Sequence, residues 1–117
     1  MEIINFADAQ DSQILSTIRQ RCSGHKLRWT NHILIRLFQR GISIDDVTSA
    51  LLSGEIIERY PKDYPHPSYL ILGLTSANKI LHVVCGIGPD DLYLITAYYP
   101  DPARWEADGK TRKDVSS

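Results

Sequence analysis

The chain has 117 residues, and its 14 acidic and 13 Lys or Arg side chains leave a formal net charge of −1. This length fits a single domain with one hydrophobic core, and the near-zero charge argues against a strongly basic nucleic-acid protein. No apolar run approaches the roughly 20 residues that a membrane helix needs. The N-terminus lacks the basic region and long apolar core of a secretory signal, so we expect a cytoplasmic protein.

Three helices are predicted in the first half of the chain. Apolar residues recur with helical spacing over residues 9–22, and Gly24 can end that helix. Residues 25–29 form a short basic connection. A second helix is predicted from about Asn31 to Arg40, and a third from about Ile44 to Ser53, where Ser43 can cap its start.

Four apolar residues of the second helix have the spacing of a buried stripe, so we expect this side of the helix to anchor it. They are Ile33, Leu34, Leu37 and Phe38.

The second half is predicted to form strands, because it has four runs rich in β-branched and aromatic residues, with short turns between the last three. The runs cover residues 55–60, 69–75, 80–86 and 92–99. We therefore expect an α+β fold, in which the N-terminal helices pack on one face of an antiparallel sheet of three to four strands.

Beyond the strands the chain becomes polar. Trp105 can fold back onto the body, whereas residues 107–117 are predicted to be a disordered tail. We see no internal repeat and no domain boundary, and we predict a single domain over residues 1–106.

The distribution of charge is more informative than its total. No acidic residue lies between Asp11 and Asp45, whereas that interval holds six Lys or Arg residues, Arg28 among them, and two histidines. A local excess of cations can hold phosphate groups. The alternative is that these side chains lie on solvated helix faces.

Three residues of the second helix recur every four positions and therefore share one side of it: His32, Arg36 and Arg40. The arginine fork matches phosphate oxygens, and histidine exchanges protons near neutral pH. Cleavage of an RNA phosphodiester needs a base, a cation for the phosphorane and an acid. This set is suited to those roles; in the alternative, His32 packs at the helix N-terminus and the arginines lie in water.

Further candidates lie in the strands. His82 interrupts an apolar strand and can project with Lys79 and a tyrosine of the last strand into a cleft; alternatively it is a satisfied histidine on a solvent-facing surface. Thr96 and Tyr98 end the last strand, where tyrosine can stack on a base or pack in the core. Alternation sends Tyr98 and Tyr99 to opposite faces.

The loop between the first two predicted strands is rich in proline and aromatic residues. Tyr64 and His66 lie in this loop, and Tyr60 and Tyr69 lie at its two ends. This loop is either a specificity lip or a rigid connection.

No cofactor or metal is predicted. Cys22 and Cys85 are far apart and fit buried free thiols in a reducing compartment. The four histidines lack metal-ligand spacing, and Gly86-Ile87-Gly88 lacks the third glycine and the following helix of a nucleotide loop.

A series of motifs, taken in order, resembles the bacterial family of domains of unknown function numbered 4258, over about residues 28–106. The motifs are His32 with Arg36, Arg40-Gly41-Ile42-Ser43, Asp46-Val47, Ala50-Leu51, Gly54-Glu55-Ile56-Ile57-Glu58, Tyr60-Pro61, Pro67-Ser68, Leu72-Gly73, Leu81-His82-Val83-Val84 and Ile95-Thr96-Ala97-Tyr98-Tyr99-Pro100-Asp101 with Trp105.

That family is similar to the RelE-like ribonuclease toxins of the barnase–EndoU–colicin–RelE group. The resemblance implies a small helices-then-sheet fold, metal-independent RNA cleavage and a toxin–antitoxin pair, in which an MqsA-type zinc-finger antitoxin is a common neighbour. It implies functional roles for His32, Arg36, Arg40, His82, Thr96 and Tyr98. RelE-type toxins are usually strongly basic, and this chain is not; the alternative is a non-catalytic RNA- or protein-binding module.

Overall fold

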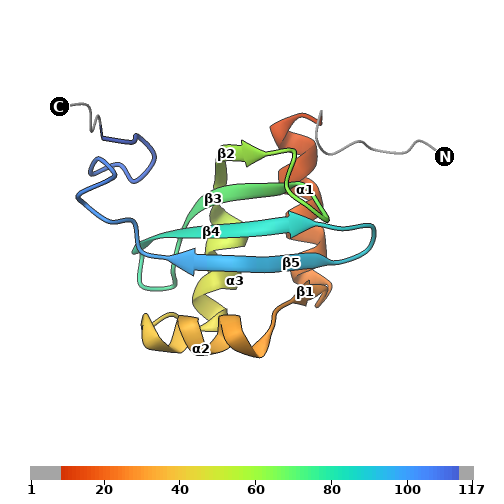
Figure 1. Cartoon of the computed structure of the whole chain (residues 1–117), viewed down its shortest axis with the longest axis horizontal. Coiled ribbons are helices and arrows are strands. Elements are labelled where there is room, and N and C mark those ends of the chain that lie inside the picture. Colours follow the sequence, from red (N-terminus) through yellow and green to blue (C-terminus); the bar gives the residue numbers. More distant parts are fainter. Residues whose placement is uncertain (1–8, 114–117) are drawn as a thin grey trace.

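The computed structural model of the chain describes residues 9–113. Three helices and a five-stranded open sheet, with strand order β1-β5-β4-β3-β2, make up this part (Figure 1). The mixed α+β class predicted from the sequence is confirmed. Residues 1–8 of the predicted domain and 114–117 of the predicted tail lie outside the described residues.

The helices are α1 (Asp11–Ser23), α2 (Asn31–Gln39) and α3 (Ile44–Ser53). Their starts follow from capping side chains. The Thr30 hydroxyl accepts the Ile33 N–H, and Ser43 and Asp46 form a reciprocal capping box at the start of α3. The predicted limits of α3 agree with the structure.

The strands are β1 (Leu27–Arg28), β2 (Glu55–Tyr60), β3 (Ser68–Leu74), β4 (Ile80–Ile87) and β5 (Leu92–Tyr98). Strands β2 to β5 form an antiparallel meander, as expected. The prediction of three to four strands missed β1, which pairs in parallel with β5. A two-residue strand is too short to show an alternating pattern, and the sequence shows only a basic connection there.

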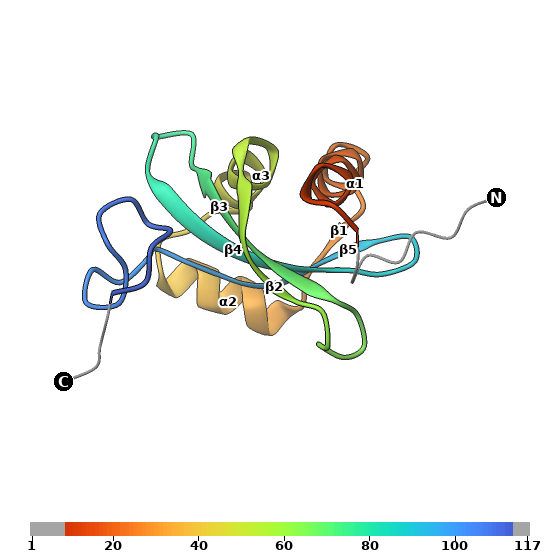
Figure 2. The same cartoon turned by 90° about the horizontal axis from the view of Figure 1, so that it is seen from above.

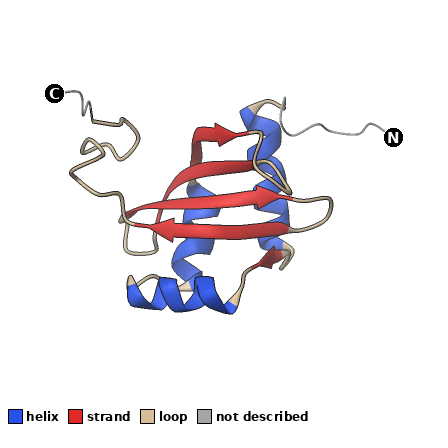
Figure 3. Cartoon of the chain, viewed as in Figure 1, coloured by secondary structure: helices blue, strands red, loops and turns tan. Residues whose placement is uncertain are grey.

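The helices do not all lie on one face of the sheet, and the prediction on this point was wrong. Helices α1 and α3 cover one face, whereas α2 lies alongside β5 at the edge and on the opposite side (Figures 1 and 2). The chain between α1 and α2 forms β1 at that edge of the sheet (Figure 3). Because the chain crosses the edge there, α2 begins on the other side of the sheet from α1 (Figure 2).

The predicted apolar stripe of α2 is buried only in part. Leu37 is 1% exposed and Ile33 is half-buried, whereas Leu34 is 42% exposed and Phe38 is 85% exposed. A helix that packs beside a single edge strand can bury only a narrow side, so one residue carries most of the contact.

The main core lies between the sheet and the pair α1 and α3. Helix α3 approaches β3 closely, since a Cβ at Gly73 would lie 1.9 Å from the Ala50 carbonyl oxygen. Leu37 of α2 also belongs to the cluster of buried residues. The other largest fully buried apolar side chains of the cluster are Tyr69, Ile14, Ile18, Leu51, Ile71, Leu81 and Leu92.

The side of the sheet away from α1 and α3 is called the open face below. A β-bulge in β5 opposite Val84 and Cys85 places Ile95 and Thr96 on this face, together with Tyr93 and Tyr98. No helix of residues 9–113 covers the middle of this face, since α2 lies beyond β5 at the edge (Figure 1).

One end of the open face is covered by the C-terminal segment, residues 99–113. Trp105 is 5% exposed and forms a β-bridge with Arg112, and the Gly109 carbonyl meets His82. Residues 107–113, for which the composition predicts disorder, include Gly109, which contacts the sheet in this structure. A tryptophan and a glycine hold this polar segment on the sheet, and a composition-based prediction does not register such contacts.

No helix within residues 9–113 combines the length and apolar character required to cross a membrane.

Candidate functional site

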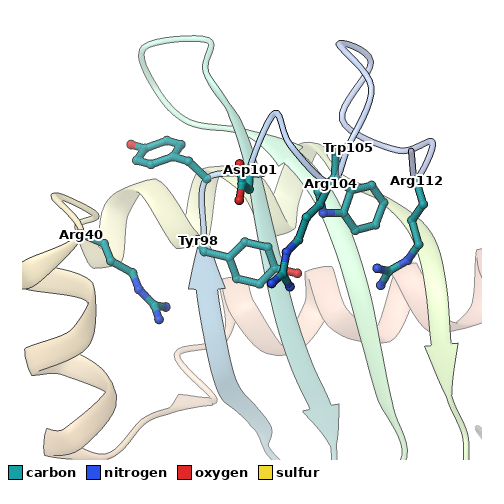
Figure 4. A pocket seen from close by; sticks show the side chains of 7 residues that line it. Arg40, Tyr98, Asp101, Arg104, Trp105 and Arg112 are labelled. Atoms are coloured by element: carbon teal, nitrogen blue, oxygen red, sulfur yellow. The ribbon is translucent and has the colours of Figure 1, made fainter. Parts of the chain in front are cut away.

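A pocket of about 440 Å³ lies where β5, the end of α2 and the C-terminal segment meet (Figure 4). We call it the arginine pocket. Its lining residues are Arg40, Tyr98, Tyr99, Asp101, Arg104, Trp105 and Arg112.

Arg40 is the C-cap residue of α2, and its side chain reaches across to β5. One guanidinium nitrogen, Nη1, donates to Thr96 Oγ1 at 3.1 Å and to the Ala97 carbonyl at 2.8 Å. Within residues 9–113 no carboxylate pairs with Arg40. Its charge is therefore held in place by neutral acceptors and stays available to an anion.

Arg104 and Arg112 differ in their surroundings. Arg112 forms two hydrogen bonds with Glu58, from Nε to Oε2 at 2.6 Å and from Nη2 to Oε1 at 2.9 Å, and lies 4.5 Å from the Trp105 ring centroid. Arg104 is exposed beside Tyr98 (Figure 4), and its side chain has no hydrogen-bond or ion-pair partner among residues 9–113. Arg104 thus supplies a second available cation.

The pairing of Glu58 and Arg112 shifts both groups toward their charged forms. The hydrogen bond from Arg112 lowers the pKa of Glu58, and the same bond raises the pKa of Arg112. The pair fixes the C-terminal segment on β2 and holds the guanidinium over Trp105.

His82 lies beneath the pocket and is fully buried. Its Nε2 is 2.6 Å from the Gly109 carbonyl oxygen, which can only accept, so Nε2 carries the hydrogen. Its ring meets Trp105 and Tyr98 edge to face, with centroid distances of 4.6 and 5.3 Å. Burial lowers the pKa of His82, so the imidazole is neutral at pH 7 and supports the two aromatic walls.

Tyr98 is half-buried and its ring faces the pocket (Figure 4). Burial raises the pKa of Tyr98, although the nearby Arg112 opposes this shift. The phenol therefore remains protonated at neutral pH and can donate a proton or a hydrogen bond to a bound oxygen.

The structure brings four of the predicted residues together. Arg40 and Tyr98 line the pocket, Thr96 holds Arg40, and His82 supports Tyr98 from below.

The other four predicted residues lie outside the pocket. His32 and Arg36 are exposed on α2, and the eight residue steps from His32 to Arg40 correspond to about 12 Å along the helix. Arg28 pairs with β5 at Tyr93, and Lys79 lies in the exposed turn between β3 and β4.

Sequence reasoning missed the contributions of Asp101, Arg104 and Arg112. All three belong to the C-terminal segment, part of which was expected to be disordered. The usable signal was Trp105, because a large apolar side chain in a polar segment indicates that the segment packs against something.

Among the described residues, neither a cysteine nor a cluster of metal ligands lines the arginine pocket. Cys22 and Cys85 are unpaired and buried, as predicted, and burial raises the pKa of Cys85 to about 12. No three His, Cys, Asp or Glu side chains of residues 9–113 gather in a way that could hold a metal ion.

The profile of a family described as "Domain of unknown function (DUF4258)" matches residues 29–99, which is more than half of the chain. The chain belongs to the DUF4258 family. The DUF4258 match begins just before α2 and ends with β5, so it includes Arg40 and Tyr98 but neither α1 nor the C-terminal segment. No curated protein and no solved structure matches the chain.

Proposed function

We propose that this DUF4258 protein is an endoribonuclease that binds an RNA phosphodiester in the arginine pocket and cleaves it without a metal ion, as the toxin of a toxin–antitoxin pair. The observation that carries the proposal is the pair of available guanidinium groups, Arg40 and Arg104, which face the same pocket as the Tyr98 phenol. The toxin role rests on the resemblance to RelE-like ribonucleases.

The pocket offers the charges that phosphodiester cleavage needs. Arg40 and Arg104 can bind the nonbridging phosphate oxygens and stabilise the negative charge of the phosphorane. The neutral Tyr98 phenol can protonate the leaving 5′ oxygen. The Asp101 carboxylate lines the same pocket and can accept the proton of the attacking 2′-hydroxyl.

The first experiment measures cleavage of a single-stranded RNA by the purified chain in the presence of EDTA. We expect wild type to give products ending in a 2′,3′-cyclic phosphate. We expect Arg40→Ala to slow cleavage by about 100-fold or more, as for removal of one group that stabilises the transition state. Tyr98→Phe keeps the ring and should also lower the rate. An intact substrate after incubation with folded wild type would reject the nuclease proposal.

The second experiment tests the toxin role by expressing the chain in bacteria from a tightly controlled promoter. Wild type should arrest growth and Arg40→Ala should not. Growth unaffected by wild type, at a level of protein that is detectable in the lysate, would argue against a toxin.

The burial of His82 favours a second candidate, a module that binds RNA and does not cleave it. A fully buried imidazole cannot exchange protons with a substrate, and the pocket then lacks the proton-transferring histidine expected from the sequence. This candidate predicts RNA binding that weakens with salt and yields no product.

A further inference from the structure

A second pocket of about 600 Å³ lies on the open face, near the start of β5. Within it, the rings of His66 and Tyr93 are stacked in parallel, with centroids 5.2 Å apart and planes at 10°. Tyr64 is 95% exposed at its rim. We call this region the aromatic shelf; its lining residues are Asp63, Tyr64, Pro65, His66, Gly86, Tyr93 and Ile95.

The stacked pair is supported from behind. A Cβ at Gly88 would lie 2.7 Å from Tyr93 Cε2 and 3.2 Å from His66 Nε2, so a side chain at this position would have to displace the two rings. Arg21 of α1 holds the same turn, since its guanidinium donates to the carbonyls of Gly88 at 2.5 Å, Asp91 at 2.9 Å and Pro89 at 3.0 Å. The shelf is therefore a fixed platform.

A cation lies next to the shelf. Arg28 of β1 is the register partner of Tyr93, so the two side chains lie side by side on the open face. The side chain of Arg28 is more than half exposed, and its Nε lies 3.5 Å from Asp91 Oδ2. An exposed ion pair of this kind is weak and can exchange for a phosphate.

Strand β5 joins the shelf to the arginine pocket. Tyr93, Ile95, Thr96 and Tyr98 follow one another on the open face because of the bulge in β5. The five residue steps from Tyr93 to Tyr98 span roughly 17 Å at the usual rise of a strand. A chain of a few nucleotides covers this distance.

We infer that single-stranded RNA runs along β5 from the arginine pocket to the aromatic shelf, where a base stacks on Tyr93 and Arg28 contacts the adjoining phosphate. This inference rests on the proposed function and adds a binding site for flanking nucleotides. Aromatic platforms accept any base, so the shelf adds affinity and length preference without strict sequence choice. Asp63 at the rim can accept a hydrogen bond from a base amino group.

The test compares a dinucleotide with a nine-nucleotide strand, both carrying 2′-O-methyl groups that block cleavage, in NMR titrations of the full chain. The variants are Tyr93→Ala, Tyr93→Phe and Arg40→Ala. Phe38→Ala is the matched control, because Phe38 is an exposed aromatic residue on the side of α2 opposite Arg40.

We expect Tyr93→Ala to weaken binding of the longer strand by about tenfold and to leave the dinucleotide unchanged. Tyr93→Phe and Phe38→Ala should bind like wild type, and Arg40→Ala should weaken both ligands. If Arg40→Ala is impaired but Tyr93→Ala keeps full affinity for the longer strand, the shelf is overturned and the proposed function stands. If Tyr93→Ala weakens binding of both ligands equally, the proposal for the aromatic shelf is also overturned. If wild type binds neither ligand, both this inference and the proposed function are overturned.

Discussion

Gly109 is the residue on which the attachment of the C-terminal segment depends most directly. Its carbonyl accepts the His82 hydrogen bond, its φ is +74°, and a Cβ would lie 2.8 Å from Ile80 Cγ2. The position therefore demands glycine for its conformation and also for the space beneath it.

Gly41 offers a matched control for Gly109, because its φ is +70° and a Cβ there would have no heavy atom within 4 Å beyond its own residue and the two neighbours in the chain. We expect Gly41→Ala to lower the free energy of unfolding by about 1–2 kcal/mol, from backbone strain alone. Gly109→Ala should lose about 1–3 kcal/mol more from overpacking. Urea unfolding measures both, and equal losses would contradict the close contact with Ile80.

His82 makes stability depend on pH. Burial lowers the pKa of His82 from its ordinary value of 6.5, so below pH 6.5 the unfolded chain binds a proton that the folded chain resists. The free energy of unfolding should fall as the pH drops from 7 to 5, by at most about 1.4 kcal/mol per pH unit.

The variant His82→Phe keeps an aromatic ring and removes the titrating group, so this part of the pH dependence should disappear. Urea unfolding of both proteins at pH 7 and pH 5 measures the difference. An equally steep fall in His82→Phe would assign the effect to other groups.

The position of a single residue could be predicted where the residue belongs to a helix or strand, because the regular spacing sets the direction of its side chain. The helical spacing of Arg40 and the strand position of Tyr98 were enough to propose them for one site, and both line the arginine pocket. Arg104 and Arg112 reach it through turns and a lone β-bridge, in which no periodic pattern exists to reveal their direction.

At the scale of elements, α2 differs from α1 and α3 because it has a single buried residue. Leu37 is buried, whereas Leu34, Ile35 and Phe38 are all exposed. Its N-terminal cap at Thr30 and the contact of Arg40 with β5 complete the attachment. The helix therefore acts as a side wall of the open face.

This arrangement predicts a sharp contrast between neighbouring substitutions in α2. Leu37→Ala should lower the free energy of unfolding by about 2–4 kcal/mol through a cavity, whereas Phe38→Ser should change it by less than about 0.5 kcal/mol. Urea titrations followed by circular dichroism compare the two. A large loss in Phe38→Ser would mean that its ring packs on the protein.

Most elements could be predicted because their signals are local. The Ser43–Asp46 capping box sets the start of α3, and short turns mark the limits of β4 and β5. Strand β1 exists only because its two residues pair with β5, and the side of the sheet on which α2 lies follows from that pairing. Pairing between residues so far apart in the chain leaves no local pattern in the sequence.

For the whole molecule, one face of the sheet is covered by α1 and α3, while the other is left open between α2 and the C-terminal segment (Figures 1 and 2). Cations and aromatic rings gather along this open face, although the net charge of the chain is only −1. A local arrangement of charge can thus favour a polyanion on a nearly neutral protein.

The central claim is that the arginine pocket binds RNA through its phosphates, and salt-dependent binding tests it most directly. Fluorescence anisotropy of a labelled, cleavage-resistant single strand should show affinity that falls linearly with salt on logarithmic axes. Arg40→Ala should weaken binding and reduce the magnitude of this slope by about one, because one phosphate contact is lost. Binding absent at low salt, or unchanged in affinity and slope by Arg40→Ala, would contradict the account.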